Sequence, residues 1–505
     1  MPPPPGASSI EGDVAYRAMT SRDARFDGVF YVGVTSTGIY CRPVCPVKSP
    51  QRKNCRFFSS AEAAEKARFR PCLRCRPELA PGNAPVDHAH RIAQLIVHRI
   101  DEGLLDDGSD LEEVSAQFNL SSRQLRRIVQ QELGVSPIEL LQTRRLLLAK
   151  QLLTETRLPV TEVAFASGFS SLRRFNDAFS SQYRMPPTRL RKEAAGASPV
   201  TGSHDTSTLQ LTYRPPYDWS GILAFLSSRM VRDVEFITAD SYARTIRLGS
   251  HVGWVRLTHV AERRALMVEF THSLMPVLPA LLGRLRNLFD LSARPDLIAQ
   301  HLGKDQRLRK AVRKDPGLRV PGAFDGFELA VRAILGQQIT VKAATTLACR
   351  FADAFGERIE TPFPELGRLS PLPARVAAAS VDAIAKLGII SSRARSIIAL
   401  AQAQVARTLH LEAGASPEAA IAELVKLPGI GPWTAHYIAM RALRWPDAFP
   451  TNDIAVRKNL GGVSAKEADR LSLAWRPWRS YAVLHIWKNL PDSPSTAPRR
   501  RPKIK

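Results

Sequence analysis

The sequence predicts a multidomain protein that is mainly α-helical and contains smaller α+β parts. Three observations lead to this prediction. The 505 residues exceed what a single hydrophobic core usually organises. Five of the six cysteines lie before residue 80, which marks a small module of distinct composition at that end. Long stretches with apolar residues at helical spacing surround one stretch of short β-favouring runs.

Changes in composition divide the chain into six segments. In order they are a cysteine-rich module at 1–80, an Arg-rich helical segment at 88–192, a small and polar linker at 193–206, an α+β subdomain at 207–292, an all-helical domain at 293–490, and a basic, disordered tail at 491–505.

The charge balance favours a polyanionic partner. Lys and Arg number 71 against 47 Asp and Glu, a formal charge of +24. Such an excess suits nucleic acid, because each neutralised phosphate releases counterions, although an acidic membrane surface would also fit. No apolar run is long enough to span a bilayer and no signal peptide opens the chain, so a cytoplasmic protein is expected. In that reducing compartment, metal binding or catalysis is a commoner use of cysteine than disulfides.

The cysteine module has the spacing of a zinc site. Cys41 and Cys45 form one close pair, and Cys72 and Cys75 form another, with 26 residues between the two pairs. Two pairs on separate loops can bring four thiolates to one tetrahedral Zn²⁺. Such a site is often purely structural. Four thiolates against two positive charges nevertheless leave the sulfurs electron-rich, so an exposed one could accept a methyl group.

The sequence around these cysteines resembles the N-terminal domain of the Ada methylphosphotriester repair proteins. The similar segments are Thr37–Cys45 and Arg70–Pro77, and the resemblance covers about residues 11 to 80. It implies one Zn²⁺ held by Cys41, Cys45, Cys72 and Cys75. It also implies that Cys41 accepts a methyl group from the DNA backbone in a single, suicidal transfer. Methylation would remove negative charge facing DNA and so strengthen DNA binding.

The helical segment contains an internal repeat typical of paired helix-turn-helix units. Val114–Ser121 aligns with Val163–Ser170, and a second helix follows each unit, with apolar residues four apart as at Leu125 and Val129. A helical bundle with a solvated basic face is the alternative, which two tandem units make less favourable. The predicted DNA-reading residues on the outer faces are Arg123, Gln124, Arg127, Arg173, Arg174 and Asn176.

This segment resembles the AraC-type regulators, and its position after an Ada-like domain matches the Ada proteins. The resemblance implies a transcriptional activator of alkylation-response genes, with promoter DNA and RNA polymerase as partners, in the nucleoid of a bacterial cytoplasm. One departure is Arg184, where glycine is common in this family.

A glycine hairpin between two predicted helices marks the C-terminal domain. In Leu427–Ala435, Gly429 and Gly431 permit a tight turn and a close backbone approach, so N–H groups at the following helix start can hold a DNA phosphate. Asp453 lies 22 residues after Gly431. Taken alone, Asp453 could simply cap the next helix.

In context, this pattern resembles the helix-hairpin-helix glycosylases, and more closely the AlkA-type 3-methyladenine DNA glycosylases. The AlkA resemblance covers about residues 207 to 490 and rests on Tyr213–Ser220, Val331–Gln338 and Arg476–Trp487. It implies an AlkA-like α+β subdomain before a helix-hairpin-helix core, with Asp453 as the catalytic carboxylate. The implied base pocket consists of Phe225, Trp433, Tyr437 and Trp487.

The expected chemistry begins with extrusion of the damaged nucleotide from the duplex. Electron-rich aromatic faces favour a cationic alkylated purine, and Asp453 would stabilise positive charge on the sugar. Trp433 occupies the position where strand-cutting relatives carry lysine, so a monofunctional glycosylase is predicted. Two departures from the family concern its substrate range: Gln338 replaces an apolar wedge, and Ile454 replaces an aromatic residue.

The sequence therefore predicts a bifunctional transcriptional activator and DNA repair enzyme. One alternative is a DNA-binding regulator whose glycosylase fold is catalytically inactive. Another is a glycosylase fused to an inert zinc and helix-turn-helix targeting arm. The Pro-Cys-His-Arg motif of O6-methylguanine reversal does not occur, so that activity is not expected.

Overall fold

The computed structural model describes most of the chain in two compact units. The described residues are 12–23, 26–27, 30–58, 61–77, 88–101, 103, 111–118, 120–194, 205–450 and 452–488. The predicted tail at 491–505 and all but the ends of the predicted linker at 193–206 lie outside them. One unit comprises 1–96 with 118–137, and the other comprises 97–117 with 138–505. No helix of the described residues is long and apolar enough to cross a bilayer.

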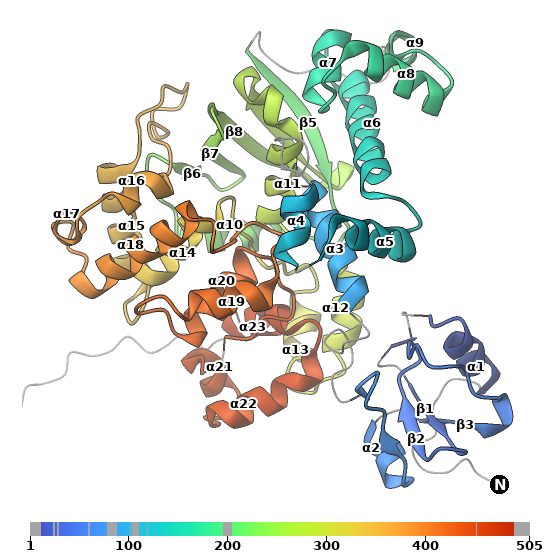
Figure 1. The fold of residues 1–505 in the computed structure, drawn as a ribbon. Coiled ribbons are helices and arrows are strands. Elements are labelled where there is room, and N and C mark those ends of the chain that lie inside the picture. Colours follow the sequence, from blue (N-terminus) through green and yellow to red (C-terminus); the bar gives the residue numbers. More distant parts are fainter. Residues whose placement is uncertain are drawn as a thin grey trace, which may run out of the picture. The chain divides into compact units, whose positions relative to one another are not determined.

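The cysteine module is a small mixed sheet with two short helices (Figure 1). Its helices are α1 (Gly12–Thr20) and α2 (Ala61–Lys66), and its strands, in spatial order, are β3 (Cys55–Phe58), β1 (Tyr31–Val34), β2 (Ile39–Cys41) and β4 (Arg70–Pro71). β2 and β4 pair in parallel, with Tyr40 opposite Pro71. This pairing matters most for the module, because a cysteine lies at the end of β2 and another directly follows β4.

Seven helices form the next part of the chain. They are α3 (His88–Asp101), α4 (Leu111–Gln117), α5 (Ser122–Leu133), α6 (Pro137–Glu155), α7 (Val160–Ala166), α8 (Leu172–Tyr183) and α9 (Pro187–Ala194). Ser121 caps α5 and Ser171 caps α8, and each side chain accepts the backbone N–H of the third residue of its helix. Phe175 and Phe179 of α8 are fully buried, as the apolar spacing predicts.

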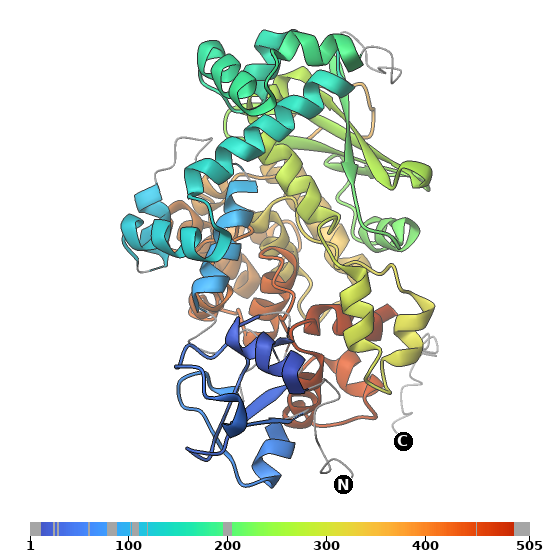
Figure 2. The same cartoon turned by 90° about the vertical axis from the view of Figure 1, so that its right-hand side faces the viewer.

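The α+β part is a five-stranded antiparallel sheet with helices on it. In spatial order the strands are β5 (Thr206–Thr212), β9 (Ala265–Thr271), β8 (His251–Val260), β7 (Ser241–Leu248) and β6 (Glu235–Ile237). The connecting elements are α10 (Trp219–Ser227), η5 (Ala261–Arg263) and η6 (His272–Val277). Helix α11 (Leu278–Leu288) packs along the sheet and shares its apolar core (Figure 2).

The remaining part is all-helical. Its helices are α12 (Pro295–Leu302), α13 (Arg309–Lys314), α14 (Gly326–Leu335), α15 (Val341–Phe355), α16 (Pro373–Ala377), α17 (Val381–Ala385), α18 (Ser391–Val405), α19 (Pro417–Leu424), α20 (Pro432–Arg441), α21 (Ile454–Asn459), α22 (Ala465–Ser472), η7 (Leu473–Trp475) and α23 (Arg479–Lys488). Their buried faces form one continuous apolar core. The mainly helical multidomain prediction is confirmed.

Helices α5 and α8 end in the same way despite different residues. Gly134 ends α5 with a φ of 76°, and Arg184 ends α8 with a φ of 55°; each N–H donates to a carbonyl one turn back. Only glycine adopts this left-handed conformation without a steric penalty from its side chain. The unusual residue at 184 therefore leaves the helix ending unchanged but costs stability.

We predict that Arg184→Gly stabilises the protein by about 1 kcal/mol, because it removes the left-handed penalty while keeping the terminal hydrogen bond. The measurement is the melting temperature of the full chain followed by circular dichroism. Gly134→Arg is the matched control and should destabilise by a similar amount. A lower melting temperature for Arg184→Gly would contradict this account.

Candidate metal centre and active site

The strand pairing of the cysteine module assembles the four predicted ligands. Because β2 and β4 run in parallel, Cys41 and Cys72 come to lie side by side, and the Cys72 N–H donates to the Tyr40 carbonyl at 3.0 Å. The sulfur atoms of Cys41, Cys45, Cys72 and Cys75 all lie within 4.8 Å of one another. Each of these residues is at most 7% exposed, so Cys41 is less accessible than the sequence suggested.

The crowding of these sulfurs fits a cation at their centre. Hydrogen bonds from Cys41 and Cys75 lower the pKa of Cys45 to about 3. The hydrogen bond between Cys41 and Cys45 has the opposite effect on Cys41 and raises its pKa. Four thiolates at this spacing therefore cannot ionise together without a cation among them. Arg42, fully buried and paired with Asp27, donates its backbone N–H to the Cys75 sulfur at 3.4 Å. A tetrahedral Zn²⁺ matches this donor set.

The glycine hairpin joins α19 to α20. Gly429 has a φ of 74°, and a Cβ atom there would lie 2.5 Å from the Ser396 hydroxyl, so glycine is required. A Cβ atom at Gly431 would meet nothing within 4 Å, so the fold itself does not require glycine at that position. Gly431 is the N-cap residue of α20, and no side-chain hydrogen bond caps the helix there, so backbone N–H groups of the first turn can bind an anion.

Asp453 combines the two roles that the sequence left open. Its Oδ1 accepts the Val456 N–H at 2.8 Å and thereby caps α21. The indole N–H of Trp433 donates to Oδ2 at 2.9 Å, and that of Trp487 donates to Oδ1 at 3.2 Å. The carboxylate is thus 7% exposed and held by three donors from α20, α21 and α23.

A cavity of about 250 Å³ opens beside this carboxylate, and we call it the aromatic cavity. Trp433, Tyr437, Trp487 and Asp453 line it. The Trp433 and Tyr437 rings stack at 5.3 Å with 7° between their planes, and Trp487 lies 6.3 Å from Tyr437. Four of the residues predicted for the catalytic pocket therefore come together.

Phe225 has a different environment. It is not among the residues that line the aromatic cavity, and the guanidinium of Arg229 covers its ring at 3.9 Å. Arg229, Arg332 and Arg441 themselves line the cavity, which the sequence analysis did not predict. Phe225 lies in the last turn of α10, whereas Arg229 lies in the turn that follows the helix, where its N–H donates to the Leu226 carbonyl at 2.9 Å. The four-residue spacing alone does not predict this contact.

Gln338 lies in the short loop between α14 and α15. Its side chain is exposed and its φ is 56°, a conformation uncommon for a residue other than glycine. The neighbouring Gln337 amide donates to the Gly429 carbonyl at 2.9 Å and to the Thr434 hydroxyl at 3.1 Å. The loop that carries Gln338 is therefore fastened to the hairpin. Ile454, next to the central carboxylate, is 80% exposed.

Most of the predicted DNA-reading side chains on α5 and α8 face outward, with one qualification on each helix: Gln124 on α5 has a second role, and Asn176 on α8 is less exposed. Arg123, Gln124, Arg127, Arg173 and Arg174 are exposed, whereas Asn176 is half-buried. The side-chain Oε1 of Gln124 accepts the Ser121 N–H at 2.9 Å, so the Gln124 side chain completes a capping box. The Ser-x-x-Gln spacing was the sequence signal for this second role.

Four protein families match successive parts of the chain. They are the metal binding domain of Ada at residues 14–78, a helix-turn-helix domain at 114–193, the AlkA N-terminal domain at 208–325, and the HhH-GPD superfamily of base excision DNA repair proteins at 331–472. The zinc site, the hairpin and Asp453 lie within these matches.

One relative matches nearly the whole chain. The probable bifunctional transcriptional activator/DNA repair enzyme AlkA of Mycobacterium tuberculosis is 39% identical over 488 residues, covering 94% of this chain and 96% of the relative. The chain belongs to this bifunctional AlkA family. The DNA-3-methyladenine glycosylase 2 of Escherichia coli is 39% identical over 277 residues, which cover 55% of this chain and 95% of that protein. The AdaA protein of Bacillus subtilis is 29% identical over 182 residues, 36% of this chain and 82% of AdaA.

Membership of the bifunctional AlkA family confirms several predictions. The chain joins a transcriptional regulator to a DNA repair enzyme with a glycosylase domain, and it binds DNA. It carries one Zn²⁺ in the Ada-type domain, where the four-cysteine cluster lies.

We predict that Cys75→Ser abolishes zinc binding, because it removes the fully buried ligand of the cluster. Zinc content per chain, measured by atomic emission, should fall from one to none. Cys55→Ser is the matched control: its thiol donates to the Gln51 carbonyl at 3.4 Å and lies outside the cluster. Full zinc retention by Cys75→Ser would show that the cluster is not the metal site.

Proposed function

We propose that the C-terminal half hydrolyses the N-glycosidic bond of alkylated purines of the 3-methyladenine type in duplex DNA. The observation that carries this proposal is the Asp453 carboxylate held by the Trp433 and Trp487 indoles at the edge of the aromatic cavity. The relative named as a DNA-3-methyladenine glycosylase supports the substrate class. In this proposal the glycosylase consists of the predicted α+β subdomain at 207–292 and the predicted helical domain at 293–490.

The damaged nucleotide leaves the stack and its base enters the aromatic cavity. Backbone N–H groups at the start of α20 hold a phosphate beside it, and Gln338 fills the space that the base vacates. A cationic base gains from stacking on Trp433 and Tyr437, and its positive charge makes it a good leaving group.

The bond between C1′ and the base nitrogen then breaks, and its electron pair goes to the base. Asp453 faces the positive charge that develops on the sugar and orients the water whose oxygen bonds to C1′. Because the cationic base leaves as a neutral molecule, the proton lost by this water passes to the Asp453 carboxylate and then to solvent. Of the described residues that line the cavity, none is a lysine. The product is therefore an intact abasic site, because no lysine amine is placed to form a Schiff base.

We predict that Asp453→Asn lowers base release from methylated DNA on the order of 100-fold, about 2.7 kcal/mol, by removing the charge that stabilises the sugar cation. Asparagine still caps a helix, so the fold should persist. The measurement is 3-methyladenine release by the full chain, with borohydride present in a parallel reaction to trap any covalent DNA adduct.

The matched control is Asp325→Asn, since Asp325 caps α14 in the same way but lies outside the aromatic cavity. Its base release should equal that of the unmodified chain. Undiminished release by Asp453→Asn would favour the alternative of a DNA-binding regulator with an inactive fold. A trapped adduct in the unmodified chain would contradict a monofunctional enzyme.

We also propose that Cys41 takes a methyl group from a DNA methylphosphotriester. The C–O bond of the ester breaks, a C–S bond forms, and the phosphate leaves as a diester anion. The Ada-type domain and the clustered thiolates support this step. The outward residues of α5 and α8 then read promoter DNA and recruit RNA polymerase to alkylation-response genes, at the nucleoid of a bacterial cytoplasm.

We predict that methylation of Cys41 raises DNA affinity about tenfold at low salt, because one negative charge facing the phosphates disappears. Methylphosphotriester DNA would supply the methyl group, mass spectrometry would locate it, and fluorescence anisotropy would measure affinity across salt concentrations. The Cys55→Ser chain, which retains the cluster, is the control and should respond equally. Methylation without a change in affinity would indicate an inert targeting arm.

A further inference from the structure

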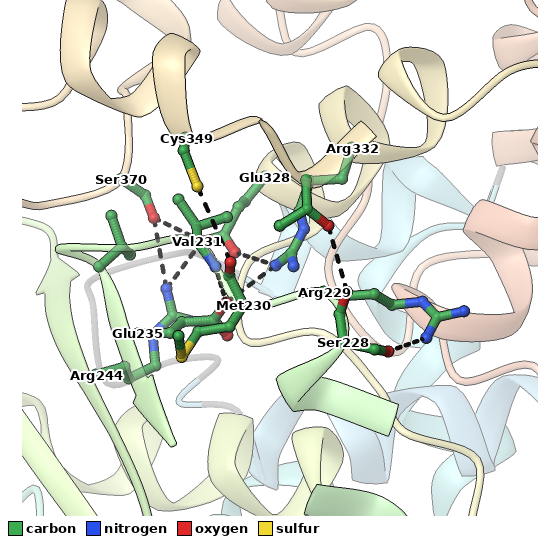
Figure 3. Close-up of polar contacts among 12 residues, drawn as sticks. Ser228, Arg229, Met230, Val231, Glu235, Arg244, Glu328, Arg332, Cys349 and Ser370 are labelled. Atoms are coloured by element: carbon green, nitrogen blue, oxygen red, sulfur yellow. Dashed lines mark hydrogen bonds and ion pairs between the residues drawn. The ribbon is translucent and has the colours of Figure 1, made fainter. Parts of the chain in front are cut away.

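Helix α14 is anchored to the antiparallel sheet by buried ion pairs (Figure 3). Nη1 of Arg332 on α14 lies 3.3 Å from Oε2 of Glu235 on β6 and 3.2 Å from Oε1 of Glu328, and Glu328 also pairs with Arg244 of β7 at 2.8 Å. Ser370 donates to Glu328 at 2.6 Å. Burial alone would raise the pKa of Glu328, but Arg244 and Arg332 lower it to about 2. The loop that follows α14 therefore starts from a fixed point.

This loop connects α14 to α15 and consists of residues 336–340, which we call the wedge loop because it carries Gln338. Gly336 and Ile339 line the aromatic cavity, whereas Gln338 is exposed. The φ of Gln338 is 56°, a left-handed conformation with a steric cost for any residue that has a side chain. Such a conformation persists only where neighbouring contacts maintain it.

The contacts that maintain it come from Gln337, the preceding residue. Its side-chain Nε2 donates to the Gly429 carbonyl at 2.9 Å and to the Thr434 hydroxyl at 3.1 Å, so both N–H groups of the amide have acceptors. The main-chain carbonyl of Gln337 accepts a hydrogen bond from the guanidinium of Arg393, in the first turn of α18. Gln337 thus ties the wedge loop to the hairpin by its side chain and to α18 by its main chain.

The hairpin end of this link adjoins the proposed catalytic group. Thr434 is 4% exposed and directly follows Trp433, whose indole N–H donates to Asp453 at 2.9 Å. Helix α18 supports the hairpin as well, because its Ser396 hydroxyl fills the space where a Cβ atom of Gly429 would lie. The wedge loop, the phosphate-binding hairpin and the carboxylate are therefore connected through a short chain of hydrogen bonds.

We propose that Gln337 and Arg393 are positioning residues for base extrusion, which hold Gln338 at the place along the duplex that the hairpin-bound phosphate sets. The inference rests on the proposed glycosylase function, and neither residue touches the reacting atoms. A wedge offsets the cost of unstacking only if it enters the stack where the base departs. Without this link the aromatic cavity and Asp453 remain intact, but the base leaves the duplex less often.

The test separates extrusion from bond cleavage by presenting 7-methylguanine in two settings: paired with cytosine in a duplex, and within an unpaired loop flanked by the same duplex. The full chain carries Gln337→Met, which keeps the length of the side chain and removes its N–H donors. Single-turnover base release from the paired setting should fall about tenfold, because extrusion there requires unpairing. Release from the loop should stay within about twofold, since a base that is already unpaired costs less to extrude.

Two further variants test whether both residues act through Gln338. Arg393→Met should reproduce the selective loss from a different helix, and Arg393→Lys should recover part of it, because lysine can still donate to the Gln337 carbonyl. In a Gln338→Ala chain, which already lacks the wedge, adding Gln337→Met should lower release from the paired setting no further.

Gln404→Met is the matched control. Gln404 is half-buried like Gln337, and its amide donates to the Leu409 carbonyl at 2.6 Å, outside the aromatic cavity. Both rates should stay unchanged in this variant. An equal loss from both settings in Gln337→Met and Arg393→Met, or a full additional loss in the Gln338→Ala chain, would overturn the inference and leave the proposed function standing. Release from neither setting by the unmodified chain would overturn both.

Discussion

The pair of indole hydrogen bonds to Asp453 organises the C-terminal half. Trp433 stands on the first turn of α20, directly after the hairpin, and Trp487 stands near the end of α23. Through the carboxylate, these two helices are tied to the start of α21. The element that can hold a DNA phosphate and the group that can stabilise a sugar cation therefore have a fixed relation. A displaced hairpin would break the Trp433 hydrogen bond and leave the carboxylate held only by Trp487 and the Val456 N–H.

The metal centre follows the same principle with a different scaffold. The parallel pairing of β2 and β4 brings together two cysteine pairs that lie far apart in sequence. At the four-cysteine cluster and at Asp453, the surrounding backbone and side chains hold negatively charged groups in place, although the chain as a whole has a formal charge of +24. The excess of Lys and Arg attracts DNA without regard to sequence or damage. The cysteine thiolates and the Asp453 carboxylate are instead the groups that can interact with an electron-poor carbon atom.

The sequence predicts well where chemistry depends on spacing along the chain. The cysteine pairs and the hairpin glycines follow from intervals and residue types, whereas Asp453 was identified by resemblance to the helix-hairpin-helix glycosylases. The structure brings the four cysteines together and places Asp453 at the aromatic cavity. The sequence predicts less well where one side chain has two possible partners. The Gln124 side chain caps α5, although it was predicted to read DNA, and the guanidinium of Arg229 covers the Phe225 ring, which was predicted to contact the base. In each case a neighbouring group of the protein binds the side chain that the prediction assigned to DNA.

The charge of the aromatic cavity lay beyond sequence reasoning for a related reason. Whether an arginine contributes net charge depends on its partners. Glu235 of β6 and Glu328, four residues earlier on α14, pair with Arg332. Among the described residues, no carboxylate forms an ion pair with Arg229 or Arg441. Burial alone would raise the pKa of Tyr437, yet Arg441 and Arg229 hold it below its ordinary value. The cavity wall is thus positive opposite the negative carboxylate.

These opposite charges act against one another on a flipped base. Stacked indole and phenol rings, with Asp453 beside them, favour a purine that is already cationic. Arg229 and Arg441, which line the same cavity, oppose that preference because like charges repel. The rings and the carboxylate therefore have to outweigh this repulsion, and the two indole hydrogen bonds that fix Asp453 keep its negative charge at the cavity where it can do so.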